Sequence, residues 1–306
     1  MRLPLALAAL VSLLAVAVPT ATGQEEEYSR KGADTCISCH EDATTLALFK
    51  TRHAVPGDPR SPFGHGQLQC EACHGPGDQH SGRVRRNQER PPILSFLDSD
   101  TTPVETQNAM CLDCHASEIQ FGWHAGAHPT DEVACADCHT SHAARDPVLQ
   151  TATQPAVCFD CHQAQRNEAM KAFSHPFRQG KMECSSCHTA HGDNAATQMV
   201  RATVNDTCQQ CHADTRGPYL WEHAPVSEDC GACHAPHGSN HPGMLTQRAP
   251  LLCQSCHSQS GHPSVAYGTE GLAGNTPSQY LLGQGCLNCH SQVHGSNHPS
   301  GSNLSR

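Results

Sequence analysis

Large apolar side chains are concentrated at the start of the chain. After Arg2, residues 3–18 form an almost unbroken apolar run, and small residues then lead to the polar stretch that begins at Gln24. This order is typical of a secretory signal peptide, and the run is shorter than the roughly 20 residues that a membrane-spanning helix needs. The pattern predicts a signal peptide over residues 1–23 and an exported mature chain over residues 24–306.

The rest of the chain shows little sustained periodicity of either the helical or the strand type. Its 24 glycines and 21 prolines are spread along the length, and aromatic residues make up 4% of the total. A chain so poor in large side chains has little apolar surface from which to build a core. We therefore predict a single extended domain of short α-helices and coil with little or no sheet, whose core is supplied by something other than side chains.

All twenty cysteines belong to ten copies of the pattern Cys-x-x-Cys-His. Zinc ribbons and disulfides do not require the histidine, which would follow all ten pairs by chance with a probability on the order of 10⁻¹¹. Covalent attachment of c-type haem does require it: both cysteines and the histidine lie on one face of a helical turn, where two thioethers hold the porphyrin and the imidazole binds iron. We therefore predict ten covalently bound haem c groups (Fe), with proximal ligands His40, His74, His115, His139, His162, His188, His212, His234, His257 and His290. The attachment residues are Cys36, Cys39, Cys70, Cys73, Cys111, Cys114, Cys135, Cys138, Cys158, Cys161, Cys184, Cys187, Cys208, Cys211, Cys230, Cys233, Cys253, Cys256, Cys286 and Cys289.

Fourteen histidines remain to supply a second axial ligand to each iron. After the odd-numbered motifs the next useful histidine generally lies well downstream, whereas after the even-numbered motifs it follows closely. The predicted distal ligands are His53, His80, His128, His142, His175, His191, His223, His237, His262 and His294. The four histidines left over are expected to cap propionates or to face solvent, with His65 as the alternative to His53 and His298 as the alternative to His294 among the distal ligands. They are His65, His124, His241 and His298.

The short spacing in the even-numbered motifs restricts which iron the second histidine can reach. His191 follows His188 by three residues, and at most ~10 Å of chain cannot pass around a macrocycle to its far face. His191 and its equivalents should therefore bind a neighbouring haem. We call each pair of consecutive motifs a module; the alternation predicts five dihaem modules, at about residues 33–82, 108–145, 155–195, 205–243 and 250–300.

Charge and two insertions complete the sequence picture. Without Arg2 the mature chain has 18 basic and 29 acidic residues, a net charge of −11, which makes nucleic acid an improbable partner.

The insertion at residues 75–108 carries a basic cluster that we interpret as a solvated loop or propionate partner, with docking to an acidic partner as the alternative. The insertion at residues 263–285 ends in an apolar segment expected to cover the last haem pair. The basic cluster comprises Arg83, Arg85, Arg86 and Arg90, and the apolar segment comprises Tyr280, Leu281 and Leu282.

Every motif ends in histidine, and enough histidines remain to close every iron. An enzyme would need an open iron position or a different proximal ligand. The sequence thus favours an electron-transfer protein without catalytic residues. The alternative is a multihaem reductase with one five-coordinate haem.

The motif count, the repeated CHxxHG pattern and the ending CLNCHSQVHGSNHPSG resemble the MtrA/DmsE-type periplasmic decahaem cytochromes, the group with MtoA and PioA. The resemblance implies bis-histidine ligation and an elongated haem wire in the periplasm. It also implies insertion into a large outer-membrane β-barrel, with electrons passing between periplasmic and extracellular multihaem cytochromes or a terminal reductase, for extracellular metal reduction or oxidation.

The chain has no lipid-spanning segment, and a polar surface rich in loops cannot face lipid, so crossing a membrane requires a protein sheath. A soluble periplasmic electron shuttle and, less favoured, a subunit of an extracellular cytochrome filament are the alternatives. The spacings to His262 and His294 differ from those in the other modules and leave distal ligation in the last module open.

Overall fold

The structure is a computed structural model, and it describes residues 27–117, 123–192, 198–257, 285–299 and 301–304. The predicted signal peptide, His262 and nearly all of the second insertion lie outside these residues. Most of the described helices have four to seven residues, and α5 has twelve. The α-helices are α1 (Ala33–Ile37), α2 (Ala43–Ala47), α3 (Glu71–His74), α4 (Asp78–Ser81), α5 (Val104–His115), α6 (Ala127–Thr130), α7 (Cys135–Cys138), α8 (Gln154–Phe159), α9 (Gln163–Ala169), α10 (Val204–Cys208), α11 (Ala224–Glu228) and α12 (Ala249–Gln254). The 3₁₀-helices are η1 (Leu48–Lys50), η2 (Arg52–Ala54), η3 (Trp123–Ala125), η4 (Pro147–Leu149), η5 (Cys184–Ser186), η6 (Ala213–Thr215), η7 (Cys230–Ala232), η8 (Pro242–Met244) and η9 (Cys286–Asn288).

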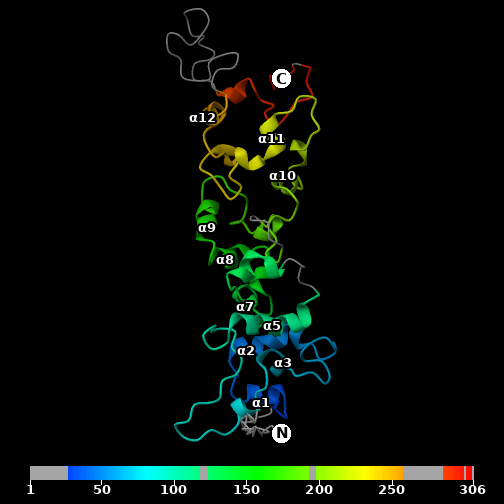
Figure 1. Ribbon diagram of the computed structural model, residues 1–306, viewed down its shortest axis with the longest axis vertical. Coiled ribbons are helices and arrows are strands. Elements are labelled where there is room, and N and C mark those ends of the chain that lie inside the picture. The colour runs from blue at the N-terminus through cyan, green and yellow to red at the C-terminus, as the bar shows by residue number, and fades with distance from the viewer. Residues whose placement is uncertain (1–26, 118–122, 193–197, 258–284, 300, 305–306) are drawn as a thin grey trace, which may run out of the picture.

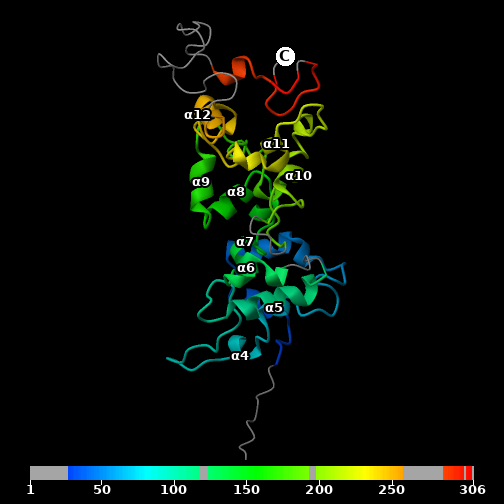
Figure 2. The ribbon, with the colours of Figure 1, turned by 45° about the horizontal axis from the view of Figure 1, so that its top comes forward.

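The molecule is long and narrow, and sequence order is broadly kept along its long axis (Figures 1 and 2). Helices α1, α3 and α5 lie toward one end, α8 and α9 near the middle, and α11 and α12 toward the other end. Backbone pairing within the described residues is limited to isolated antiparallel bridges, such as Phe173 with Ser239 and Trp221 with Ser296. The prediction of short helices and coil with little or no sheet is confirmed.

Each motif folds as one helical turn. The backbone N–H of the motif histidine donates to the carbonyl of the first cysteine at 2.8–3.0 Å in nine motifs, and the motif at Cys111 lies inside α5. The first motif of each module begins near the end of an α-helix, namely α1, α5, α8, α10 or α12. The second motif occupies a single turn, namely α3, α7, η5, η7 or η9.

Side chains alone form a very small core. The buried hydrophobic residues that the structure describes are four alanines and Trp123, and no large described side chain is fully buried. A continuous cavity of about 5620 Å³ is lined by residues from Ser29 to Leu304, several times larger than the roughly 300–1,000 Å³ of a pocket for one ligand. The interior surface is therefore built to surround an extended set of groups rather than one.

Candidate haem-binding sites

Cysteine and histidine dominate the chemistry of this cavity. All twenty cysteines line it, together with all ten motif histidines and the described distal candidates. The four leftover histidines, His65, His124, His241 and His298, are not among its lining residues. The lining of the cavity thus includes the described histidines that the motif spacing assigns to iron, and it omits the four that the spacing leaves over.

Nine of the motif histidines face a second histidine across this cavity, with ring centroids 5.9–6.3 Å apart. A metal–imidazole bond of about 2.0–2.1 Å, plus about 1.1 Å from nitrogen to ring centre, places two imidazoles on opposite sides of one metal ion about 6.2–6.4 Å apart. The residues therefore fit a group with one iron between each pair. The pairs are His40/His80, His53/His115, His74/His142, His128/His162, His139/His191, His175/His212, His188/His237, His223/His257 and His234/His294.

Most of these pairs connect neighbouring modules, and they do so reciprocally. At the boundary between the second and third modules, His128 reaches forward to His162 while His191 reaches back to His139. His191 thus faces His139 and not His188, as its short spacing requires. We call each such boundary a junction. The other junctions hold His53/His115 with His142/His74, His175/His212 with His237/His188, and His223/His257 with His294/His234.

The two ends of the molecule follow a different rule. His40 faces His80, which belongs to the same first module. At the far end, Nδ1 of His290 lies 2.6 Å from the Asn303 carbonyl oxygen, and its expected partner His262 lies outside the described residues.

Backbone carbonyls orient many of these imidazoles. The Nδ1 atoms of His128, His175 and His223 donate to the carbonyl of the residue just before the reciprocal histidine, at 2.8–3.2 Å. Donation from Nδ1 leaves Nε2 as the nitrogen that is available to a metal. It also ties the two histidines of one junction to each other. The three acceptors are Ala190, Pro236 and Val293.

A carboxylate takes the place of the carbonyl at two histidines. Nδ1 of His139 lies 2.7 Å from Asp146 Oδ2, and Nδ1 of His237 lies 3.2 Å from Glu168 Oε2. By contrast, Nδ1 of the motif histidine His234 donates to the Gly243 carbonyl at 2.8 Å. The histidines proposed to bind iron thus do not all have the same kind of hydrogen-bond partner at Nδ1: some face a charged carboxylate and others a neutral carbonyl.

Burial lowers the pKa of four distal histidines. Loss of solvent, together with neighbouring imidazoles, lowers the pKa of His53, His142, His191 and His294. A lowered pKa favours the neutral imidazole, which is the form that binds a metal.

The cysteine thiols are mutually close in an alternating order. Within a module the two first cysteines interact, as Cys36 and Cys70 do, whereas across a junction the second cysteines lie close enough to affect each other's pKa, as Cys73 and Cys114 do. Burial, together with the neighbouring Cys36 thiol, raises the pKa of Cys70 to about 12. Successive motifs therefore approach one another along the whole chain. The other first-cysteine contacts are Cys111/Cys135, Cys158/Cys184, Cys208/Cys230 and Cys253/Cys286.

Side-chain amides clamp the two motifs of a module, a feature that the sequence analysis did not identify. Asn108 accepts from the Cys135 backbone N–H at 2.8 Å, and Asn205 accepts from the Cys230 N–H at 2.8 Å. Gln154 performs the same task in the third module, since its Oε1 accepts from the Ser185 N–H at 2.9 Å. A polar amide three or four residues before a motif was the available signal.

Close backbone approach explains the glycine that follows two distal histidines. Gly238 has φ +147° and Gly295 has φ +129°, in the region that favours glycine. A Cβ at Gly238 would collide with the Glu168 carbonyl oxygen, and one at Gly295 would collide with the Tyr219 ring. The repeated HG pattern thus reflects packing at the junctions.

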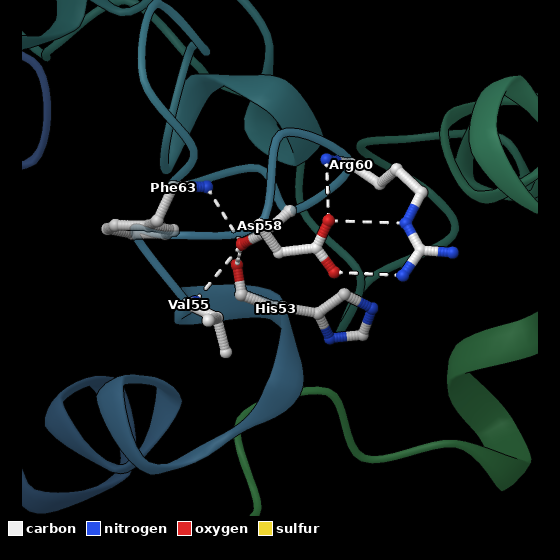
Figure 3. A network of polar contacts seen from close by, with 6 residues as sticks. His53, Val55, Asp58, Arg60 and Phe63 are labelled. Atoms are coloured by element: carbon white, nitrogen blue, oxygen red, sulfur yellow. Dashed lines mark hydrogen bonds and ion pairs between the residues drawn. The ribbon is translucent and has the colours of Figure 1, made fainter.

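Ser61 holds the segment that carries His53 through bonds to His53, Val55 and Phe63, the three residues labelled beside it in Figure 3. Its Oγ donates to the His53 carbonyl and accepts from the N–H groups of Val55 and Phe63 at 3.1 and 3.2 Å. Ser61 is buried, so these bonds are shielded from water. The loop thereby fixes the backbone from which His53 reaches His115.

The first insertion also contributes to the site. The Leu94 carbonyl accepts from Nδ1 of His74 at 2.8 Å, and the Pro91 carbonyl accepts from Nδ1 of His80 at 2.8 Å. Arg90 donates to the backbone carbonyl of His80 at 2.6 Å. Part of the loop therefore positions two histidines, a role that the sequence analysis did not foresee.

Comparison with known proteins identifies the family. The chain is 45% identical over 285 residues to the multiheme cytochrome MtrA of Shewanella baltica, across 92% of this chain and 84% of that protein. The chain belongs to the MtrA family of multiheme cytochromes. As an MtrA-family protein it binds haem c through its Cys-x-x-Cys-His motifs and transfers electrons, which confirms the predicted family, cofactor type and electron-transfer function.

More distant matches agree with the MtrA assignment. The family described as "Doubled CXXCH motif" matches residues 175–217 and 223–262, and "Cytochrome c-type protein NrfB-like" matches residues 70–155. The C-type polyheme cytochrome OmcB of Geobacter sulfurreducens is 25% identical over 207 residues, which cover 59% of this chain and 25% of OmcB. The doubled-motif matches join the second motif of one module to the first of the next, so they span a junction.

Proposed function

We propose that this chain carries ten haem c groups, each with two histidine ligands, and that these groups form one continuous path for electrons along the molecule. The nine facing histidine pairs carry this proposal, because their spacing suits one iron each. The alternating approach of the cysteines supports an uninterrupted order from the first motif to the last. His262 is the proposed tenth distal ligand.

The residues of the chain have distinct tasks in this path. Bound haem supplies reversible one-electron oxidation and reduction of its iron. The cysteines fix each macrocycle through thioether bonds, and the motif histidine presents Nε2 to the iron because the helical turn holds it beside them. The reciprocal histidines close the second axial position and tie adjacent modules together. Backbone carbonyls hold the imidazoles in the required tautomer.

We further propose that the protein works in the periplasm, inserted into a large outer-membrane β-barrel. Electrons would pass between periplasmic multihaem cytochromes and an extracellular cytochrome or terminal reductase, for metal reduction or oxidation. Membership of the MtrA family and the long, narrow shape support this location. Among the described residues no helix is long and apolar enough to span a lipid bilayer. A sheath with a polar lumen would suit the polar surface of this chain.

Extraction of outer membranes with mild detergent tests the location. Size separation with haem staining should recover the cytochrome in a stoichiometric complex with a large β-barrel protein. Recovery only as a monomer in the periplasmic fraction would contradict the barrel proposal and favour a soluble shuttle. The mass of the purified chain, with ten haems expected, tests the haem count independently.

A further inference from the structure

The carboxylate at His139 is unlike the acceptors at equivalent histidines of the same chain. In the second motifs of the first and fourth modules, Nδ1 of His74 and Nδ1 of His234 donate to the neutral carbonyls of Leu94 and Gly243. In the second module, Nδ1 of His139 instead meets Asp146 Oδ2 at 2.7 Å. The chain therefore contains its own comparison between a charged and an uncharged acceptor at one structural position.

Asp146 is held firmly in this position. Its other oxygen, Oδ1, accepts from the backbone N–H groups of Thr140 at 3.2 Å and Val148 at 3.3 Å. The side chain is 15% exposed, and that of His139 is 33% exposed. The backbone just before η4 thus holds the Asp146 carboxylate against the His139 imidazole. Partial burial of both side chains limits the screening of this contact by water.

We propose that Asp146 is a positioning residue that lowers the reduction potential of the haem between His139 and His191, placing an energy step inside the electron path. A carboxylate acceptor makes the imidazole a stronger electron donor to iron. The oxidised iron carries one more positive charge than the reduced iron, so the nearby negative charge stabilises the oxidised form. This inference rests on the bis-histidine ligation proposed above.

The surroundings of His191 strengthen the effect. Trp123 is 6% exposed, and its ring lies edge-on to His191 with centroids 5.6 Å apart. An apolar wall on this side of the site reduces the local dielectric, so that the charge of Asp146 acts more strongly. Glu168 at His237 has a weaker arrangement: the distance is 3.2 Å, the carboxylate is 38% exposed, and Lys171 Nζ lies 3.7 Å away.

The position of this haem gives the energy step its functional meaning. His139 belongs to the fourth of the ten motifs, so three haems precede this site and six follow it. An electron moving in either direction must enter the low-potential site before it can continue. The proposal therefore predicts that Asp146 limits the rate through the wire without touching donor or acceptor.

Potentiometric titration of the haem-loaded full chain tests the proposal, with Asp146→Asn as the variant. Asparagine keeps an oxygen acceptor and a similar shape but removes the charge. One haem should become easier to reduce by about tenfold in its equilibrium constant, or about 59 mV for one electron. The matched control is Glu132→Gln, which removes an exposed charge in the same module at a residue that does not line the cavity, and Glu168→Gln should give a smaller shift.

Two results would overturn the inference. The first is an unchanged titration of Asp146→Asn while every haem stays low-spin. The second is an equal shift in Asp146→Glu, which keeps the charge and should stay near the wild type. Failure of bis-histidine ligation itself would appear separately, as high-spin haem in the wild type.

Discussion

At the residue scale, the spacing of histidines determines which iron each imidazole can reach. His191 and His188 are three residues apart, yet their rings face His139 and His237 in two different modules. The sequence allowed this assignment because a short chain segment cannot pass around a macrocycle. It did not identify the acceptors that hold the rings, since Asp146 and Ala190 have no motif of their own.

Replacement of His191 tests its role directly. We expect His191→Ala to leave ten haems attached, because attachment uses the motif residues, but to open one axial position on the iron bound by His139. About one-tenth of the iron should then give a high-spin signal in low-temperature electron paramagnetic resonance.

The matched control is His241→Ala, because His241 does not line the cavity. That variant should retain the wild-type spectrum. Identical spectra for the two variants would show that His191 is not an axial ligand.

At the scale of elements, the helical turns of the motifs were predictable, whereas their mutual orientation was not. Cys-x-x-Cys-His specifies a turn locally, and the bond from the histidine N–H to the first cysteine carbonyl in nine motifs agrees with it. The contact between Asn108 and the Cys135 backbone joins residues 27 apart. A single asparagine before a motif has no periodicity that would reveal such a partner.

Removal of this clamp should loosen the second module. In Asn108→Ala the Cys135 N–H loses its acceptor, and an unsatisfied, partly buried backbone group costs about 1–3 kcal/mol. We expect a lower denaturant midpoint for unfolding followed by haem absorbance.

Gln88→Ala, in the exposed part of the first insertion, is the control and should unfold as the wild type does. The role assigned to Asn108 would be wrong if its variant unfolded at the wild-type midpoint.

At the scale of the whole molecule, cofactors replace the usual hydrophobic core. The low aromatic content predicted that something other than side chains would supply the core. The buried hydrophobic residues among those described are four alanines and Trp123. An extended domain was predicted from the composition, and the family resemblance implied an elongated haem wire. The first insertion was expected to be a solvated or docking loop, but its contacts with His74 and His80 depend on tertiary packing that charge patterning does not encode.

Preventing haem attachment should therefore unfold the whole chain. Without iron, the reciprocal histidines lose the bonds that connect the modules, and side-chain burial alone cannot offset the conformational entropy. We expect the chain produced without haem to show a coil-like circular dichroism spectrum and rapid proteolysis, in contrast to the haem-loaded protein. A protease-resistant, helical apoprotein would contradict this expectation.

Quantitative low-temperature electron paramagnetic resonance of the fully oxidised, haem-loaded protein tests bis-histidine ligation at every iron at once. We expect all ten irons to be low-spin, because each lies between two histidines. A substantial high-spin signal would reveal an iron with an open or weakly bound position. It would contradict the proposal that every iron has two histidine ligands, and it would favour catalysis at the haem with the open position.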